Sequence, residues 1–324
     1  MPELDIKQLK GHRQQRLART VLSHLVMGYV WQNGESGGVK VLPRVLAVPY
    51  HQLSEALGLP PIMLHADFVL ANWKKKDPLG NLSTIVSVPG GDSLQGFVLV
   101  TLLVEVAAVP AAKAIIQAVK SVESGDQQTL IVALQDMERS INQMSEAMHL
   151  MYGYWKDNPN MPEGLIYEGI SEEPLQVSGV SATQSTIYHA LDELFGIQHK
   201  PESVDFLLRM RHYMLPAHRN FIRWVQEAPK LPEYILHSKD PALLFIFNQC
   251  ISALTELRSL HIRIVSKYVT TAGIRARAKK HQEANQSQEQ QEKGTGGSNF
   301  MSFLKIVRDT CKEGMLRDST PGDH

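Results

Sequence analysis

Apolar residues recur at three- and four-residue steps through most of the chain, which is the period of an amphipathic α-helix. The clearest stripe consists of Leu130, Leu134, Met137, Ile141, Met144, Met148 and Met151. The same period predicts helices over 12–31, 96–120, 183–195, 202–214, 217–227 and 241–270, and a last helix that carries Phe300, Phe303, Leu304 and Val307. Residues 34–94 are less regular and rich in proline and glycine. The pattern therefore predicts an all-α fold.

One predicted helical stripe contains a histidine, His261, in a row with Phe247, Cys250, Leu254, Leu257, Val265 and Tyr268. Its imidazole is predicted to point inward, where most buried polar groups bond to a carbonyl or carboxylate. The alternative is a metal or haem-iron ligand, because porphyrin iron takes a neutral imidazole from an apolar wall. Arg258 lies one turn earlier and needs an anion, which a haem propionate would supply. Periodicity alone does not choose between these interpretations.

Composition narrows the class of protein. The chain has 324 residues, 43% of them hydrophobic, with 33 basic and 33 acidic side chains, so it can bury a large core, and the charge balance gives no sign of a nucleic-acid partner. Two cysteines, Cys250 and Cys311, provide neither a disulfide framework nor a cysteine metal site, which suits a reducing cytosol.

The N-terminal residues, the longest apolar run and the most polar segment each give a further expectation. The first residues contain no apolar segment of a secretion signal, so we expect a cytoplasmic protein. The longest apolar run, 96–112, is slightly short for a bilayer and is interrupted by Glu105 and Pro110. We interpret it as a core helix and expect no membrane partner. The segment 275–299 contains almost no large apolar residue and is predicted to be a mobile loop.

Common catalytic motifs are absent from the sequence. It contains no HExxH, no P-loop and no GxSxG, and the glycine-rich segments 90–96 and 294–297 do not follow a strand as a dinucleotide site requires. Short motifs alone therefore indicate only an all-helical protein with one histidine on an apolar helix face.

Several longer sequence segments that occur in a fixed order allow a more specific interpretation. They are "VLPRVLAVPYHQLS" (41–54), "LPPIMLHADFVLANWKKKDP" (59–78), "GFVLVTLLVE" (96–105), "GLIYEG" (164–169), "RMRHYMLPAHRNFI" (209–222), "LRSLHIRIVSKYV" (257–269) and "GTGGSNFMSFLK" (294–305). Together they resemble indoleamine 2,3-dioxygenases from about residue 9 to residue 309, and look nearer to the second, less active vertebrate-type paralogue.

The resemblance implies a haem b enzyme of tryptophan catabolism. Its activity would be to insert both atoms of dioxygen across the C2–C3 bond of the L-tryptophan indole, which gives N-formylkynurenine in the kynurenine pathway. No side chain is expected to act as a general acid or base, and we expect a monomer. The implied organisation is a remnant of a small N-terminal domain at 1–88 and a large helical haem domain at 89–324 with a flexible loop at 272–299.

The resemblance also implies roles for individual residues. His261 would be the proximal iron ligand and Arg258 would meet a propionate, with Asp192 as its carboxylate partner, although Asp192 also fits a surface helix charge. The distal pocket would be formed by His65, Phe68, Val69, Phe97, Val98, Thr101, Gly179, Val180, Ser181 and Ala182, of which the last three also contact haem. Phe97 would pack on the indole or haem edge, or simply in the core. Thr295 would belong to a loop that closes over the substrate.

Several positions depart from the family pattern. The chain looks N-terminally truncated, and before "YGYWKDNP" it lacks the stretch that carries the arginine for the substrate carboxylate, near which His149 falls. Val180 replaces a usual glycine and His65 a common tyrosine. We therefore expect weak turnover, with the defect mainly in substrate binding.

A second function class depends on two tyrosines. "VPYHQL" around Tyr50 and "LIYEGI" around Tyr167 resemble the phosphotyrosine motifs proposed as adaptor sites in this family. The alternative function is a catalytically poor haem protein that recruits phosphotyrosine-binding partners. Either tyrosine between aliphatic residues also fits a buried core position, and exposure of the hydroxyls separates these interpretations.

Overall fold

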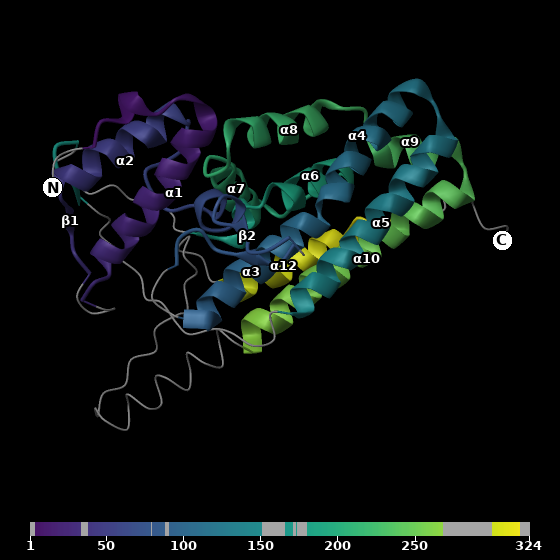
Figure 1. The fold of residues 1–324 in the computed structure, drawn as a ribbon. Coiled ribbons are helices and arrows are strands. Elements are labelled where there is room, and N and C mark those ends of the chain that lie inside the picture. The colour runs from purple at the N-terminus through teal and green to yellow at the C-terminus, as the bar shows by residue number, and fades with distance from the viewer. Residues whose placement is uncertain are drawn as a thin grey trace.

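The protein is almost entirely helical, which confirms the all-α prediction (Figure 1). The computed structural model describes residues 4–33, 38–78, 80–87, 91–150, 166–170, 173, 180–267 and 300–317. The predicted loop 272–299, with Thr295, and the positions Met151, Gly179 and Tyr268 lie outside the described residues.

The helices are α1 (Gly11–Val30), α2 (Arg44–Ala56), α3 (Gly91–Ala107), α4 (Val109–Ser124), α5 (Gln127–His149), α6 (Thr186–Leu194), α7 (Pro201–Arg211), α8 (Pro216–Glu227), α9 (Leu231–Ser238), α10 (Pro241–Val265) and α12 (Phe300–Glu313). Short helical turns are η1 (Ile6–Gln8), η2 (Ala66–Leu70) and η3 (Ala182–Gln184). The strands are two residues long: β1 (Val41–Leu42) pairs in parallel with β4 (Ile166–Tyr167), and β2 (Lys74–Lys75) pairs antiparallel with β3 (Leu82–Ser83).

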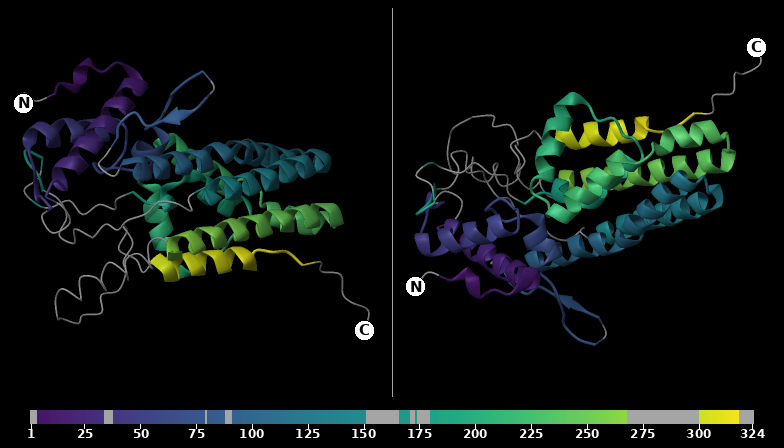
Figure 2. Two further views of the ribbon diagram at one scale, coloured as in Figure 1. Left: turned by 60° about the horizontal axis from the view of Figure 1, so that its bottom comes forward. Right: turned by 90° about the horizontal axis from the view of Figure 1, so that it is seen from above.

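The large core forms around α5, whose predicted stripe from Leu130 to Met148 is buried. This helix packs against α3, α4 and α10, and α12 returns to α10 (Figures 1 and 2). The stripe on α10 is fully buried at Phe247, Cys250, Leu254 and Leu257. Both apolar periods read from the sequence therefore mark real packing faces.

A second cluster joins the N-terminal helices. Leu22, Val26 and Val30 of α1 pack with Ala47, Tyr50 and Leu53 of α2, and Tyr167 of β4 completes the cluster. A residue from beyond position 88 thus shares the core of the first 60 residues. The domain boundary at 88 and 89 stays a prediction.

Three helical expectations need correction. The predicted helix 96–120 is two helices, because Pro110 has no N–H to continue the ladder and lies in the first turn of α4. The region 34–94 contains a regular helix, α2, with Pro49 inside it. Burial of Val48, Tyr50 and Leu53 stabilises α2 despite the missing hydrogen bond. The short helix α9 was not predicted.

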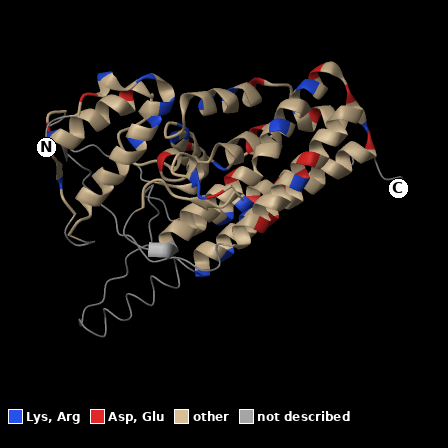
Figure 3. Ribbon diagram, viewed as in Figure 1, with Lys and Arg blue, Asp and Glu red and all other residues tan. Residues whose placement is uncertain are grey.

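Residues Leu94–Ser124 span α3 and α4 and are, by length and composition alone, apolar enough to cross a membrane. Only 33% of the most apolar part of this stretch is buried, so the interpretation of 96–112 as a core helix is only partly right. Val98, Leu102 and Val104 are buried, whereas Phe97 and Thr101 are half-buried. Charged side chains of both signs are interspersed along the helices (Figure 3).

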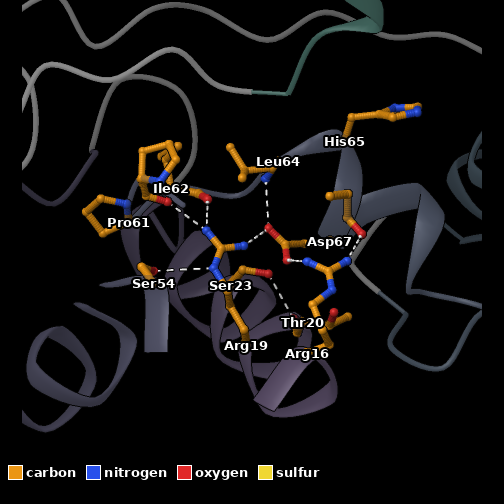
Figure 4. Close-up of polar contacts among 12 residues, drawn as sticks. Arg16, Arg19, Thr20, Ser23, Ser54, Pro61, Ile62, Leu64, His65 and Asp67 are labelled. Carbon is orange, nitrogen blue, oxygen red and sulfur yellow. Dashed lines mark hydrogen bonds and ion pairs between the residues drawn. The ribbon is translucent and has the colours of Figure 1, made fainter. Parts of the chain in front are cut away.

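The segment 60–67 between the N-terminal helices and the large core is fixed by Arg19 of α1 (Figure 4). Its guanidinium donates to Ser54 Oγ, to the carbonyls of Pro60 and Ile62, and to the carboxylate of Asp67. Neither Arg19 nor Asp67 has any exposed surface. A buried ion pair is stable only when hydrogen bonds replace the lost hydration of its polar atoms. The carbonyls and the carboxylate that bind Arg19 therefore determine the path of the chain into η2.

Candidate functional site

His261 lies near the C-terminal end of α10, on the buried stripe, and is itself half-buried. No hydrogen bond or ion pair to its imidazole is recorded among the described residues. Desolvation by the surrounding protein lowers the pKa of His261 to about 4, so the ring is neutral at neutral pH and keeps a free lone pair. The simpler expectation, a core histidine bonded to a carbonyl or carboxylate, finds no such partner in the described part of the chain.

One turn before His261, Arg258 forms a buried ion pair with Asp192 of α6. Arg258 Nη2 lies 2.7 and 2.8 Å from the two carboxylate oxygens of Asp192, and both residues are 7% exposed. Asp192 is therefore not a surface charge. Burial alone would raise its pKa, but the charge of Arg258 and the hydrogen bond from His199 at 2.8 Å lower it to about 2.

Two predicted pocket segments come together at the start of α3. The rings of Phe68 in η2 and Phe97 in α3 have centroids 6.4 Å apart, and Phe68 also stacks on His24 at 6.0 Å. Val69 and Val98 are buried beside them. The N-terminal end of α3 and the C-terminal end of α10 lie at the same end of the helical bundle (Figures 1 and 2), and η2 contacts both α3 and α1. This end of the bundle therefore gathers the expected proximal and distal residues.

The small hydroxyls are less available than the sequence suggested. Thr101 Oγ1 donates to the Phe97 carbonyl of its own helix at 2.8 Å. Ser181 Oγ caps η3 and lies 2.7 Å from Thr183 Oγ1. Val180 is half-buried and Ala182 is exposed. The Thr101 proton is therefore used within its own helix, whereas in the Ser181–Thr183 contact either hydroxyl can be the donor.

His65 is buried, and its ring is bonded to a residue whose role the sequence did not reveal. His65 Nε2 lies 2.8 Å from Glu105 Oε1, and the His65 backbone N–H donates to Gln184 Oε1 at 3.0 Å. Burial would raise the pKa of Glu105, but the His65 contact holds it below its usual range. The available sequence signal was the charge itself, because Glu105 interrupts an apolar run at four-residue steps from Phe97 and Thr101.

Other residues named from the sequence do not reach the site. His149 is exposed in the last turn of α5 and so does not point inward. Tyr50 and Tyr167 have 0% exposure, and the Tyr167 hydroxyl donates to the Pro61 carbonyl. A kinase could phosphorylate either tyrosine only after local unfolding, which gives the adaptor function no support in the folded protein.

Comparison with known proteins gives the family. Residues 1–314 match the family model described as indoleamine 2,3-dioxygenase. The chain belongs to the indoleamine 2,3-dioxygenase family. It is 50% identical to indoleamine 2,3-dioxygenase 2 of Homo sapiens, covering 98% of this chain and 83% of the relative. It is 42% identical to indoleamine 2,3-dioxygenase 1 of Rattus norvegicus, with coverage of 98% and 83%.

The chain is also similar to a protein with another name. It is 33% identical to myoglobin of Haliotis madaka, over 97% of this chain and 85% of the relative. The alignment with the human relative is 341 residues long, which exceeds the 324 residues of the chain. It therefore contains positions at which this chain has no counterpart.

Proposed function

We propose that this chain is a haem-dependent dioxygenase that opens the indole ring of L-tryptophan to N-formylkynurenine, with weak turnover. The observation that supports it most is His261, a neutral imidazole without a recorded partner among the described residues, on a buried stripe in a chain of the indoleamine 2,3-dioxygenase family. The residues fit the cofactor because a porphyrin iron needs one such nitrogen from an apolar wall.

The metal at such a site must be held mostly by a macrocycle. In the described parts of the chain, no group of three or more His, Cys, Asp and Glu side chains is close enough to hold a metal ion. His261 would provide a nitrogen to bind the iron, and Arg258, paired with Asp192, would bind a propionate. Ferrous haem, when bound, supplies the redox chemistry by which both atoms of dioxygen enter the C2–C3 bond of the indole.

The side chains around Phe97 would bind and orient the substrate. Phe68 and Phe97 offer aromatic faces to an indole, and buried Val69 and Val98 exclude water. The reaction would need no side chain to act as a general base. Its rate would therefore depend on how closely the pocket holds the indole in the reactive position. The half-buried surface of α3 is then the part of the helix that cofactor and substrate would cover.

Weak turnover would arise from the substrate carboxylate. The sequence lacks the stretch that carries the family's carboxylate-binding arginine, and His149 does not replace it because it is exposed. An unpaired buried charge costs on the order of 2–5 kcal/mol, which corresponds to roughly thirty-fold to several-thousand-fold in affinity. The Michaelis constant for L-tryptophan should therefore be high, with a smaller handicap for indoles that lack the carboxylate.

The test compares wild type with His261→Ala and with His237→Ala, an exposed histidine of α9. Each protein is titrated with haem and its absorption spectrum is recorded, and the ferrous form is then assayed with L-tryptophan and oxygen for N-formylkynurenine. Wild type and His237→Ala should bind one haem with a histidine-ligated spectrum, and His261→Ala should not. An unchanged histidine spectrum in His261→Ala would refute the assignment. Haem and oxygen binding without product would instead favour an oxygen-binding protein, as the name of the Haliotis madaka relative suggests.

A further inference from the structure

Glu105 is a charged residue on the most apolar helix of the protein. It lies eight residues after Phe97 and four after Thr101, which places it on the same face of α3, about 12 Å further along the axis. A carboxylate in such a position is tolerated only when its charge is paired and its oxygens accept hydrogen bonds. Its partners are therefore informative.

The first partner ties α3 to the segment before η2. His65 is 3% exposed, and its Nε2 lies 2.8 Å from Glu105 Oε1. The His65 backbone N–H donates to Gln184 Oε1 at the end of η3, two residues after Ala182. Through His65, the carboxylate of Glu105 connects the three segments that the family resemblance assigns to the distal pocket.

A second group near the carboxylate of Glu105 is the buried hydroxyl of Ser185. Ser185 is 2% exposed, and its Oγ has no hydrogen bond of normal geometry, yet its proximity contributes to the lowered pKa of Glu105. His218 of α8 adds a further electrostatic contribution and bonds to Thr186 at 2.8 Å. The polar groups of His65 before η2, of Ser185 between η3 and α6, and of His218 on α8 thus converge on a single carboxylate.

The neighbouring segment is held just as firmly on its other side. Two residues after His65, Asp67 is fixed by Arg19, while Arg16 donates to the Ala66 carbonyl at 2.8 Å (Figure 4). Residues 65–67 are therefore held between α1 and α3. If Glu105 released the ring of His65, the wall that carries Phe68 would keep its polar bonds to α1 and lose its hydrogen bond to α3, with only the ring contact between Phe68 and Phe97 left there.

We propose that Glu105 is a positioning residue of the reaction, which holds the imidazole of His65 so that the three segments of the distal pocket keep one geometry. This inference rests on the proposed function. Glu105 does not touch His261 or Arg258 through any recorded bond in the described chain, so it acts on substrate binding and leaves the attachment of haem unchanged.

The experiment uses the haem-loaded protein with Glu105→Gln, His65→Leu and the double variant. The control is Glu123→Gln, an exposed glutamate of α4. A charge-assisted hydrogen bond supports a loss of about tenfold to a hundredfold, so kcat/KM for L-tryptophan should fall by that factor in Glu105→Gln. The haem spectrum should match wild type, and the double variant should lose little more than the worse single variant, because both substitutions remove one interaction.

A conservative variant keeps the proposal falsifiable if Glu105→Gln does not fold. His65→Gln retains an N–H donor toward Glu105 and should keep more activity than His65→Leu. The inference is overturned if the losses of the two single variants multiply, if His65→Gln is no better than His65→Leu, or if Glu105→Gln behaves like Glu123→Gln. Wild-type protein that binds neither haem nor L-tryptophan, measured by the shift of its haem absorption band, would overturn the proposed function as well.

Discussion

Replacing Asp192 with Asn isolates the charge of the buried pair with Arg258. Asparagine keeps the size of the side chain and one oxygen acceptor, but leaves the guanidinium of Arg258, which is 7% exposed, without a counter-ion. The wild-type contacts are 2.7 and 2.8 Å to Arg258 Nη2, and 2.8 Å to His199 Nε2. The substitution therefore changes electrostatics with little change in packing.

Two independent magnitudes give the expected effect. Pairing lowers the pKa of Asp192 from 3.8 to about 2, which corresponds to about 2 kcal/mol at 1.36 kcal/mol per pKa unit. Removing one partner of a buried ion pair costs about 3–5 kcal/mol. We expect Asp192→Asn to lose about 2–4 kcal/mol of unfolding free energy at pH 7. Because the folded pKa is the lower one, this stabilisation is present above about pH 4 and is lost as the pH falls toward 2.

The control is an exposed pair of equal length. Arg139 Nη1 lies 2.7 Å from Asp136 Oδ1 on α5, with side chains 66% and 43% exposed. Asp136→Asn should cost less than about 1 kcal/mol, because solvent screens exposed pairs. Urea unfolding of both variants and wild type, followed by circular dichroism without added haem, measures the difference. Equal losses in the two variants would refute the reasoning that burial makes the Asp192 pair strong.

Two further predictions concern a buried histidine and a buried arginine. Burial lowers the pKa of His189 to about 4 although its Nε2 bonds to the Thr183 carbonyl. As the pH falls, the histidine of the unfolded chain is therefore protonated at a higher pH than that of the folded protein. The free energy of unfolding should fall by up to about 3 kcal/mol from pH 6.5 to pH 4. His189→Gln should flatten that part of the pH profile in urea unfolding, and an unchanged slope would contradict the prediction. Arg19→Leu should cost about 3–5 kcal/mol in the same assay, against almost nothing for Arg13→Leu, an exposed arginine of the same helix; equal losses would contradict it.

The parts of the structure that follow one helical face could be predicted from the sequence. The stripe from Leu130 to Met148 and the stripe through Leu254 to His261 depend only on residues three or four apart, so the period of the helix reveals them. The helix α2 could not be read in this way, because the local signal of Pro49 opposes a helix. Packing of Tyr50 and Leu53 against α1 outweighs that signal.

Long-range partners could not be predicted from local patterns. Asp192 lies 66 residues before Arg258, and only the family resemblance joined them. His65 and Glu105 are 40 residues apart, and nothing in either neighbourhood indicates that they meet. The charge of Glu105 within an apolar run did show that a partner had to exist, since an isolated carboxylate would be too costly there.

The two buried arginines differ in how fully their donors are used. Arg19 uses four of its five N–H donors, with Nε directed at Ser54, Nη1 at Asp67, and both hydrogens of Nη2 at two carbonyls. Arg258 uses Nη2 for Asp192, makes a longer contact of 3.4 Å from Nη1 to the Val307 carbonyl of α12, and also interacts with the thiol of Cys311. The bonds of Arg19 fix the segment 60–67, whereas Arg258 lies one turn from the neutral ring of His261, for which the described residues provide no recorded partner. In the proposed function, this pair of neighbours on α10 would offer a lone pair for iron and an N–H for a propionate, which is the combination that haem requires.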